Sequence, residues 1–130
     1  MSEKKKKVLI VDDEPSIREL YTHALEKAGF TALAAQTAEE GLSRATSEHP
    51  DFLLLDVRLP GMTGIVLLKK LRQLDDWGKN VPAILLTNVS PETEEMNTAI
   101  METAPSYYLM KDAITPEEVI TKINERLASQ

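Results

Sequence analysis

Side chains that could carry out chemistry follow directly after four short apolar stretches of this chain. Most of them are carboxylates, and a threonine hydroxyl, an asparagine amide and a lysine ammonium complete the set. If the apolar stretches are strands of one open parallel sheet, these side chains meet at the edge where such sheets bind ligands. In chain order they are Asp12, Asp13 and Glu14, then Asp56, then Thr87 with Asn88, and last Lys111 with Asp112.

Three carboxylates at one edge need a counter-charge, because like charges repel and raise each other's pKa. The chain has no cysteine, and its two histidines, His23 and His49, lie away from the expected strand ends. An all-oxygen ligand set favours Mg²⁺ over zinc. A cation beside a hydroxyl and a lysine suits phosphoryl transfer to a carboxylate. Asp56 is the best placed acceptor, since it lies between the acidic pair and the side of the site that holds Thr87 and Lys111.

The elements that position these residues follow from the apolar pattern. Short solid runs alternate with a 3.6-residue period, which is typical of strands that alternate with helices. The first, third and fourth runs are apolar on both faces, as in a parallel sheet that helices cover on both sides. We therefore predict an α/β fold, (βα)5 and doubly wound, with strands Val8–Val11, Thr31–Ala35, Phe52–Leu55, Ala83–Leu86 and Tyr107–Met110.

Start and stop signals mark the helices between the strands. Two places in the sequence fit a capping box, in which a threonine oxygen and a glutamate satisfy N–H groups at a helix start. A serine before a proline indicates a further helix start. Gly29 ends the first helix, and the segment 75–78 is typical of a turn in which Trp77 is a partly exposed anchor. The helix starts are Thr37 with Glu40, Thr115 with Glu118, and Ser90 before Pro91.

Composition and charge limit the classes of function. With 130 residues, 42% of them hydrophobic, the chain is typical of one globular domain, and its apolar runs are too short to span a membrane. Without cysteine or a signal peptide, we expect a cytoplasmic protein. The net charge is −6, and because residues 1–7 carry +3, residues 8–130 carry −9. A body this acidic argues against direct nucleic-acid binding. We interpret residues 1–7 as a basic flexible tail and residues 8–130 as the domain.

Four segments of the chain resemble, in order and spacing, the receiver domain of two-component response regulators. The resemblance covers nearly the whole chain. It implies a five-stranded parallel sheet in 2-1-3-4-5 order with five helices. It also implies an aspartyl-phosphate switch, rather than a conventional enzyme, that is driven by a histidine kinase or a phosphotransfer protein. The segments are Val8–Pro15, Leu54–Gly64, Leu85–Thr87 and Tyr108–Lys111.

The resemblance also implies the ligands of the cation. By position, Asp56 takes the phosphoryl group. Asp13, Asp56 and the main-chain carbonyl of Arg58 contact Mg²⁺, and Asp12 acts largely through water. The expected cofactor is therefore Mg²⁺, held at the acceptor itself.

Three further residues have roles that the resemblance implies. Thr87 hydrogen-bonds the phosphoryl group, and Lys111 pairs with it. Tyr108 is similar to the switch aromatic of the family, which turns inward when the threonine is pulled toward the phosphate. The output surface consists of the helix after Ser90, the strand that contains Tyr108, and the last helix.

Three positions depart from the family pattern. A proline with a cis peptide usually follows the lysine, and here Asp112 stands there and adds a carboxylate near the cation site. Arg58 and Val89 stand two positions after Asp56 and Thr87, where residues of this family modulate how water reaches the acyl phosphate. Valine cannot orient a water molecule, so we expect slow self-dephosphorylation.

Three alternative functions remain open. A doubly wound domain can bind flavin mononucleotide, although Asp12, Asp13 and Glu14 would repel its phosphate. A phosphatase of the haloacid dehalogenase type uses an aspartate with Mg²⁺, but it has a second aspartate where this chain has Arg58, and it needs a longer chain. A degenerate receiver would act only as a phosphorylation-independent protein-binding module.

Overall fold

The computed structural model describes residues 5–87 and 94–129. Five strands form one parallel sheet in the order β2-β1-β3-β4-β5. The predicted α/β class is confirmed, and every predicted strand is present to within one residue. The strands are β1 (Lys7–Val11), β2 (Thr31–Ala35), β3 (Phe52–Asp56), β4 (Ala83–Thr87) and β5 (Tyr107–Met110).

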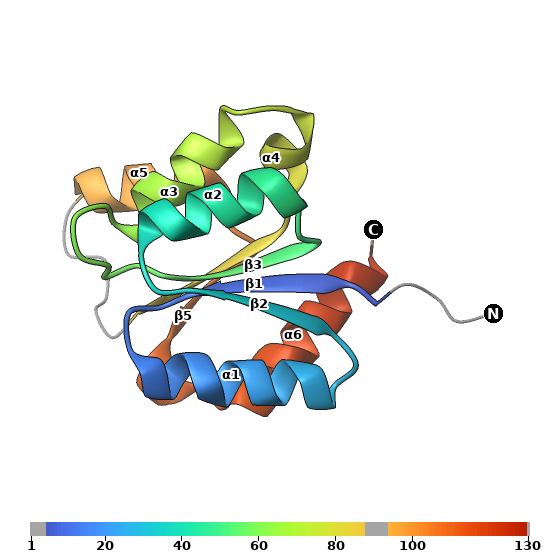
Figure 1. The fold of residues 1–130 in the computed structure, drawn as a ribbon. Coiled ribbons are helices and arrows are strands. Elements are labelled where there is room, and N and C mark those ends of the chain that lie inside the picture. Colours follow the sequence, from blue (N-terminus) through green and yellow to red (C-terminus); the bar gives the residue numbers. More distant parts are fainter. Residues whose placement is uncertain (1–4, 88–93, 130) are drawn as a thin grey trace.

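Helices cover both faces of the sheet (Figure 1). One face packs on α1 and α6, and the other packs on α2, α3 and α5. Alternate residues of β1 and β3 enter the two core layers, so that Leu9 and Leu53 join one cluster and Ile10 and Leu54 join the other. The helices are α1 (Pro15–Lys27), α2 (Ala38–Glu48), α3 (Gly64–Arg72), α4 (Asp76–Asn80), α5 (Glu94–Thr103) and α6 (Pro116–Ala128), and a short 3₁₀ turn, η1 (Lys111–Ala113), follows β5.

The segment predicted to be a turn before β4 is instead the short helix α4. Asp75 caps it, because its carboxylate accepts a hydrogen bond from the N–H of Gly78 at 2.7 Å. Gly78 lies inside this helix, where a Cβ atom would stand 1.9 Å from the carbonyl oxygen of Leu71. Residues 5–87 and 94–129 therefore contain six α-helices, one more than the five expected. Trp77 is partly exposed as predicted; its indole N–H donates to Pro50 O and its ring stacks on His49.

Helix caps follow the sequence signals in part. Gly29, with a φ of +96°, follows the end of α1, and Thr115 with Glu118 forms the complete capping box. At α2 only half of the predicted box is present. Thr37 accepts from the N–H of Glu40, but the Glu40 carboxylate accepts from the N–H of Gln36 rather than of Thr37. The expected start at Ser90 and Pro91 lies outside the described residues.

Candidate functional site

Asp12 directly follows the last residue of β1 and is fixed at each of its polar atoms. Its N–H donates to Ala35 O of the neighbouring strand at 3.1 Å. Its Oδ1 accepts from the Glu14 N–H at 2.9 Å and its Oδ2 from the Lys111 ammonium at 2.8 Å. The guanidinium of Arg18 donates to its carbonyl oxygen, also at 2.8 Å. The side chain is 2% exposed, so this buried charge is fully paired.

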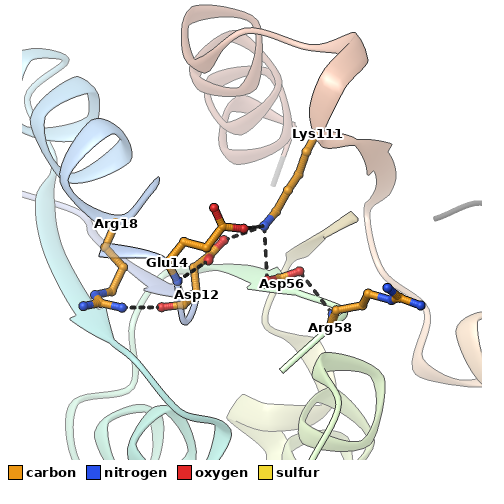
Figure 2. A network of polar contacts seen from close by, with 6 residues as sticks. All are labelled: Asp12, Glu14, Arg18, Asp56, Arg58 and Lys111. Atoms are coloured by element: carbon orange, nitrogen blue, oxygen red, sulfur yellow. Dashed lines mark hydrogen bonds and ion pairs between the residues drawn. The ribbon is translucent and has the colours of Figure 1, made fainter. Parts of the chain in front are cut away.

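Asp56 is the last residue of β3 and is likewise buried. Its Oδ1 accepts from the Arg58 N–H at 3.1 Å, and its Oδ2 lies 3.1 Å from Lys111 Nζ (Figure 2). Burial, followed by the charge of Asp12, raises the pKa of the Asp56 carboxyl from 3.8 to about 6. Lys111 and the Arg58 N–H oppose this shift less strongly. At neutral pH the carboxylate is ionised and carries an unfavourable charge that a cation would relieve.

Gly64 allows α3 to begin close beside Asp56. A Cβ atom at this position would stand 2.2 Å from the main-chain oxygen of Asp56. The N–H of Gly64 donates to Val57 O at 3.0 Å, and Thr63 caps the helix by accepting from Val66 N. Only glycine permits this approach without displacing the end of β3.

Three carboxylates meet at the carboxyl edge of the sheet. Asp12, Asp13 and Asp56 each offer an oxygen, and these oxygens lie within 4.8 Å of one another. Asp13 is exposed, whereas the other two are buried. Hard oxygen donors at this spacing fit Mg²⁺. The sequence prediction that these residues come together is confirmed by their positions, and the fit to Mg²⁺ rests on the chemistry of the donors.

Lys111 is the cation that the structure places at this cluster. It begins η1, is 12% exposed, and contacts Asp12 and Asp56 as described above, with Glu14 at 3.9 Å. Burial alone would lower the pKa of its ammonium, but the hydrogen bonds and charges of the two aspartates outweigh burial and raise that pKa. Lys111 therefore remains protonated across the physiological range.

Asp112 does not join the carboxylate cluster, contrary to expectation. Its side chain is exposed, and the cluster found among residues 5–87 and 94–129 consists of Asp12, Asp13 and Asp56. The peptide bonds of this part of the chain are all trans, including the one that joins Lys111 to Asp112. The loop is a 3₁₀ turn that directs the lysine, but not the aspartate, toward the site.

Thr87 and Tyr108 lie on the far side of Asp56 from β1. Thr87 ends β4 and is fully buried, and Tyr108 lies on β5, half-buried against the core cluster under α3. Burial raises the pKa of the Tyr108 hydroxyl, and a side-chain hydrogen bond with Thr87 opposes that rise. The two residues are therefore in contact. Asn88 and Val89 lie outside the described residues.

Two site contacts were not anticipated from the sequence. Arg18 lies in the first turns of α1 and reaches back to the Asp12 carbonyl. Tyr21 is buried one turn further on. Burial raises the pKa of its hydroxyl, the charge of Lys111 opposes that rise, and the charges of Asp12 and Glu117 add to it. The six-residue separation of Asp12 and Arg18 is only a weak indication of this contact in the sequence. Whether Arg18 contacts Asp12 depends on the orientation of α1 relative to β1, which the sequence does not specify.

No helix in the described part of the chain has the length and apolar character needed to cross a membrane.

Known proteins resemble this chain over most of its length. The family model of the response regulator receiver domain matches residues 8–124. The phosphate regulon transcriptional regulatory protein PhoB of Pseudomonas aeruginosa is 34% identical over 118 residues, which cover 91% of this chain and 50% of that protein. The sporulation initiation phosphotransferase F of Bacillus subtilis is 38% identical over 81 residues, 62% of this chain and 63% of that protein.

Solved structures agree with the sequence comparison. A CheY-like response regulator receiver domain protein from Methanospirillum hungatei matches with a TM-score of 0.87 and 30% identity, covering 97% of this chain and 96% of that one. The chain spans about half the length of the transcriptional regulators that it matches.

Proposed function

The chain belongs to the response regulator receiver domains of two-component systems, and on this basis we propose that it accepts a phosphoryl group on Asp56. One observation carries the proposal: Asp56 is a buried carboxylate at a strand end, with a lysine ammonium 3.1 Å away and two further carboxylates beside it. The donor is a histidine kinase or a histidine phosphotransfer protein. The receiver domain comprises residues 8–130, preceded by the basic segment 1–7.

The proposed transfer forms a bond from an Asp56 oxygen to phosphorus while the bond from phosphorus to the donor's imidazole nitrogen breaks. The released imidazole takes up a proton from solvent. Lys111, already 3.1 Å from Asp56, pairs with the transferred phosphoryl group, and the Thr87 hydroxyl binds one of its oxygens. Lys111 supplies positive charge and Thr87 supplies a hydrogen-bond donor where negative charge develops in the transition state.

Mg²⁺ is the cofactor that fits this site. When bound, it neutralises charge on the phosphoryl oxygens. Asp13, Asp56 and the main-chain carbonyl of Arg58 would hold it directly. Asp12 would contribute largely through water, as the resemblance to receiver domains implies.

The signal would leave through the surface made by α5, β5 and α6. Thr87 and Tyr108 would connect this surface to Asp56, since Thr87 ends the strand that pairs with β3 and its side chain shares a hydrogen bond with Tyr108. In the phosphorylated form Thr87 turns toward the phosphoryl group and Tyr108 follows it inward. The recipient is a protein partner or another domain, and the charge of −9 on residues 8–130 disfavours direct nucleic-acid binding by the receiver itself.

The test is the intact mass after incubation with Mg²⁺ and acetyl phosphate, a small phosphodonor. Wild type should gain one phosphoryl group, about 80 Da, and Asp56→Asn should gain none. Asp51→Asn is the matched control, because Asp51 directly precedes the same strand, at the end opposite Asp56, where its carboxylate accepts from Lys7 N. If wild type takes no phosphoryl group from acetyl phosphate or from a panel of kinases, a phosphorylation-independent binding module becomes the better interpretation.

A further inference from the structure

Arg18 holds the peptide that links two of the three site carboxylates. Its Nη1 donates at 2.8 Å to the carbonyl oxygen of Asp12, which belongs to the Asp12–Asp13 peptide (Figure 2). The side chain is half-buried, and it reaches this peptide from α1, whose first turn is anchored by the hydrogen bond from Arg18 N to Glu14 O. A charged donor to a main-chain carbonyl is among the stronger hydrogen bonds in proteins.

Asp13 depends on this peptide more than the other carboxylates do. The Asp12 side chain is fixed by Glu14 N and Lys111, and Asp56 by Arg58 N and Lys111. Asp13 is exposed, so the core does not hold its side chain in place. The direction in which its carboxylate projects follows from the orientation of its own backbone, whose preceding carbonyl Arg18 fixes.

We propose that Arg18 is a positioning residue for the divalent cation site, which aims the Asp13 carboxylate at Asp56 by holding the Asp12–Asp13 peptide. This inference rests on the proposed function, because it assigns Arg18 to the same cation site. Groups that orient metal ligands without touching the metal commonly contribute about 10-fold to 100-fold in metal affinity.

The sign of the effect separates positioning from simple electrostatics. Arg18 carries a positive charge close to a site for a cation, so through its charge alone it would weaken Mg²⁺ binding. Removing it would then tighten binding. If Arg18 acts by positioning, removing it weakens binding even though the site becomes more negative.

The experiment measures the Mg²⁺ dissociation constant by calorimetry, with no phosphodonor present. We expect Arg18→Gln to weaken Mg²⁺ binding about 10-fold, and Arg18→Lys, which keeps a donor and the charge, to stay within about threefold of wild type. Arg44→Gln is the matched control, because the Arg44 guanidinium also donates to a main-chain carbonyl, that of Ala34 at 3.0 Å, but belongs to α2. It should leave the Mg²⁺ affinity unchanged.

Thermal unfolding without Mg²⁺ and the acetyl phosphate assay complete the test. A folded Arg18→Gln that binds Mg²⁺ as tightly as wild type, or more tightly, overturns the inference while leaving a phosphorylatable wild type intact. If Arg18→Gln does not fold, the Mg²⁺ dissociation constants of Arg18→Met and Arg18→Lys are compared instead. We expect the Arg18→Lys variant to bind Mg²⁺ more tightly than the Arg18→Met variant, and equal affinities would overturn the inference. A wild type that binds no Mg²⁺ overturns this inference together with the proposed cofactor.

Discussion

The Nζ atom of Lys111 lies 3.1 Å from Oδ2 of Asp56, and this contact connects the end of β5 to the end of β3 across the intervening strand β4. The same ammonium lies 2.8 Å from Asp12 Oδ2. One lysine thus serves two buried carboxylates, while the third, Asp13, faces solvent. The cluster is short of positive charge, so a bound cation would relieve the repulsion between the carboxylates.

Replacing this lysine should impair phosphoryl uptake. In Lys111→Met the pKa of Asp56 should rise further, because Lys111 lowers it, and no ammonium is left to meet the phosphoryl oxygens. We expect the rate of phosphorylation by acetyl phosphate to fall about 100-fold. The measurement is the time course of the mass adduct at a fixed Mg²⁺ concentration.

Lys122→Met provides the control for that loss. Lys122 lies on α6 with its ammonium 4.7 Å from the centre of the Tyr107 ring, and the substitution removes the same charge. Its rate should equal that of wild type. Equal rates for wild type and Lys111→Met would show that Lys111 has no part in the transfer.

Asp56 should make the metal-free protein less stable at neutral pH. Because its pKa is raised from 3.8 to about 6, the native state holds this proton more tightly than the unfolded state does. The free energy of unfolding therefore falls as pH rises from about 4 to about 6, and the cost is complete above that window. Asp56→Asn should be more stable than wild type by about 1–3 kcal/mol at pH 7.

Urea unfolding in the presence of a chelator checks this pH dependence. The advantage of Asp56→Asn should change little between pH 7 and about 6, and it should shrink as pH falls from about 6 to 4.5. Asp51→Asn should show no such gain, since Asp51 lies at the other end of β3 and pairs with Lys7 N. A stability difference between wild type and Asp56→Asn that does not vary with pH would contradict the raised pKa.

Mg²⁺ should stabilise the wild type through Asp13. At a concentration ten times its dissociation constant, a ligand specific for the native state adds about 1.4 kcal/mol to the free energy of unfolding. Asp13→Asn should lose most of this gain, yet its metal-free stability should change by no more than about 0.5 kcal/mol because the side chain is exposed. Asp112→Asn, an exposed carboxylate outside the cluster, should keep the gain.

The strand pattern explains why most of the fold was predictable. Strands of a parallel sheet are buried on both faces, so β3 and β4 stand out as solid apolar runs, and the residues after them must lie at one edge. The apolar pattern therefore predicts that Asp12, Asp56, Thr87 and Lys111 lie together. All strands of a parallel sheet run in the same direction, so the residues that follow each strand in the sequence lie at the same edge of the sheet.

The partners that long side chains contact were not predictable in the same way. The Glu40 carboxylate binds Gln36 N instead of completing a box with Thr37, a choice between neighbouring N–H groups that depends on how the chain enters α2. The contact from Arg18 to Asp12 depends on the angle between α1 and β1. Helix α4 was missed because five residues are too few to show a period.

The phosphorylated form should lose its phosphoryl group slowly. Arg58 and Val89 stand two residues after Asp56 and Thr87, and valine has no polar atom to orient a water molecule toward the acyl phosphate. We expect Val89→Gln to shorten the half-life of the adduct at least about threefold, because a polar side chain can position that water. The decay of the mass adduct after removal of the donor measures this, and a wild-type half-life of only seconds would refute the expectation.

Arg72 should be the arginine whose loss costs the most stability. Its guanidinium extends from the end of α3 and donates to four main-chain carbonyls, of which Thr103 O, at 2.7 Å, and Ala104 O, at 3.2 Å, terminate α5. The other two acceptors are the carbonyl oxygens of Gly78, in α4, and of Val81, two residues before β4, so Arg72 also ties α4 and the start of β4 to α3. Burial lowers the pKa of this group, so its charge is partly desolvated and each bond to it is worth more than one at the surface.

Substitution at Arg72 removes the donor of three partly buried carbonyls and one exposed carbonyl at the ends of two helices. Arg72→Gln should lower the free energy of unfolding by about 3 kcal/mol, and Arg72→Lys, a single-point donor, should lose about half as much. Lys70→Gln, on the same helix but exposed, should cost no more than about 0.5 kcal/mol. Chemical denaturation at pH 7 measures all three, and a loss at Arg72→Gln no larger than that at Lys70→Gln would mean that water replaces the guanidinium at little cost.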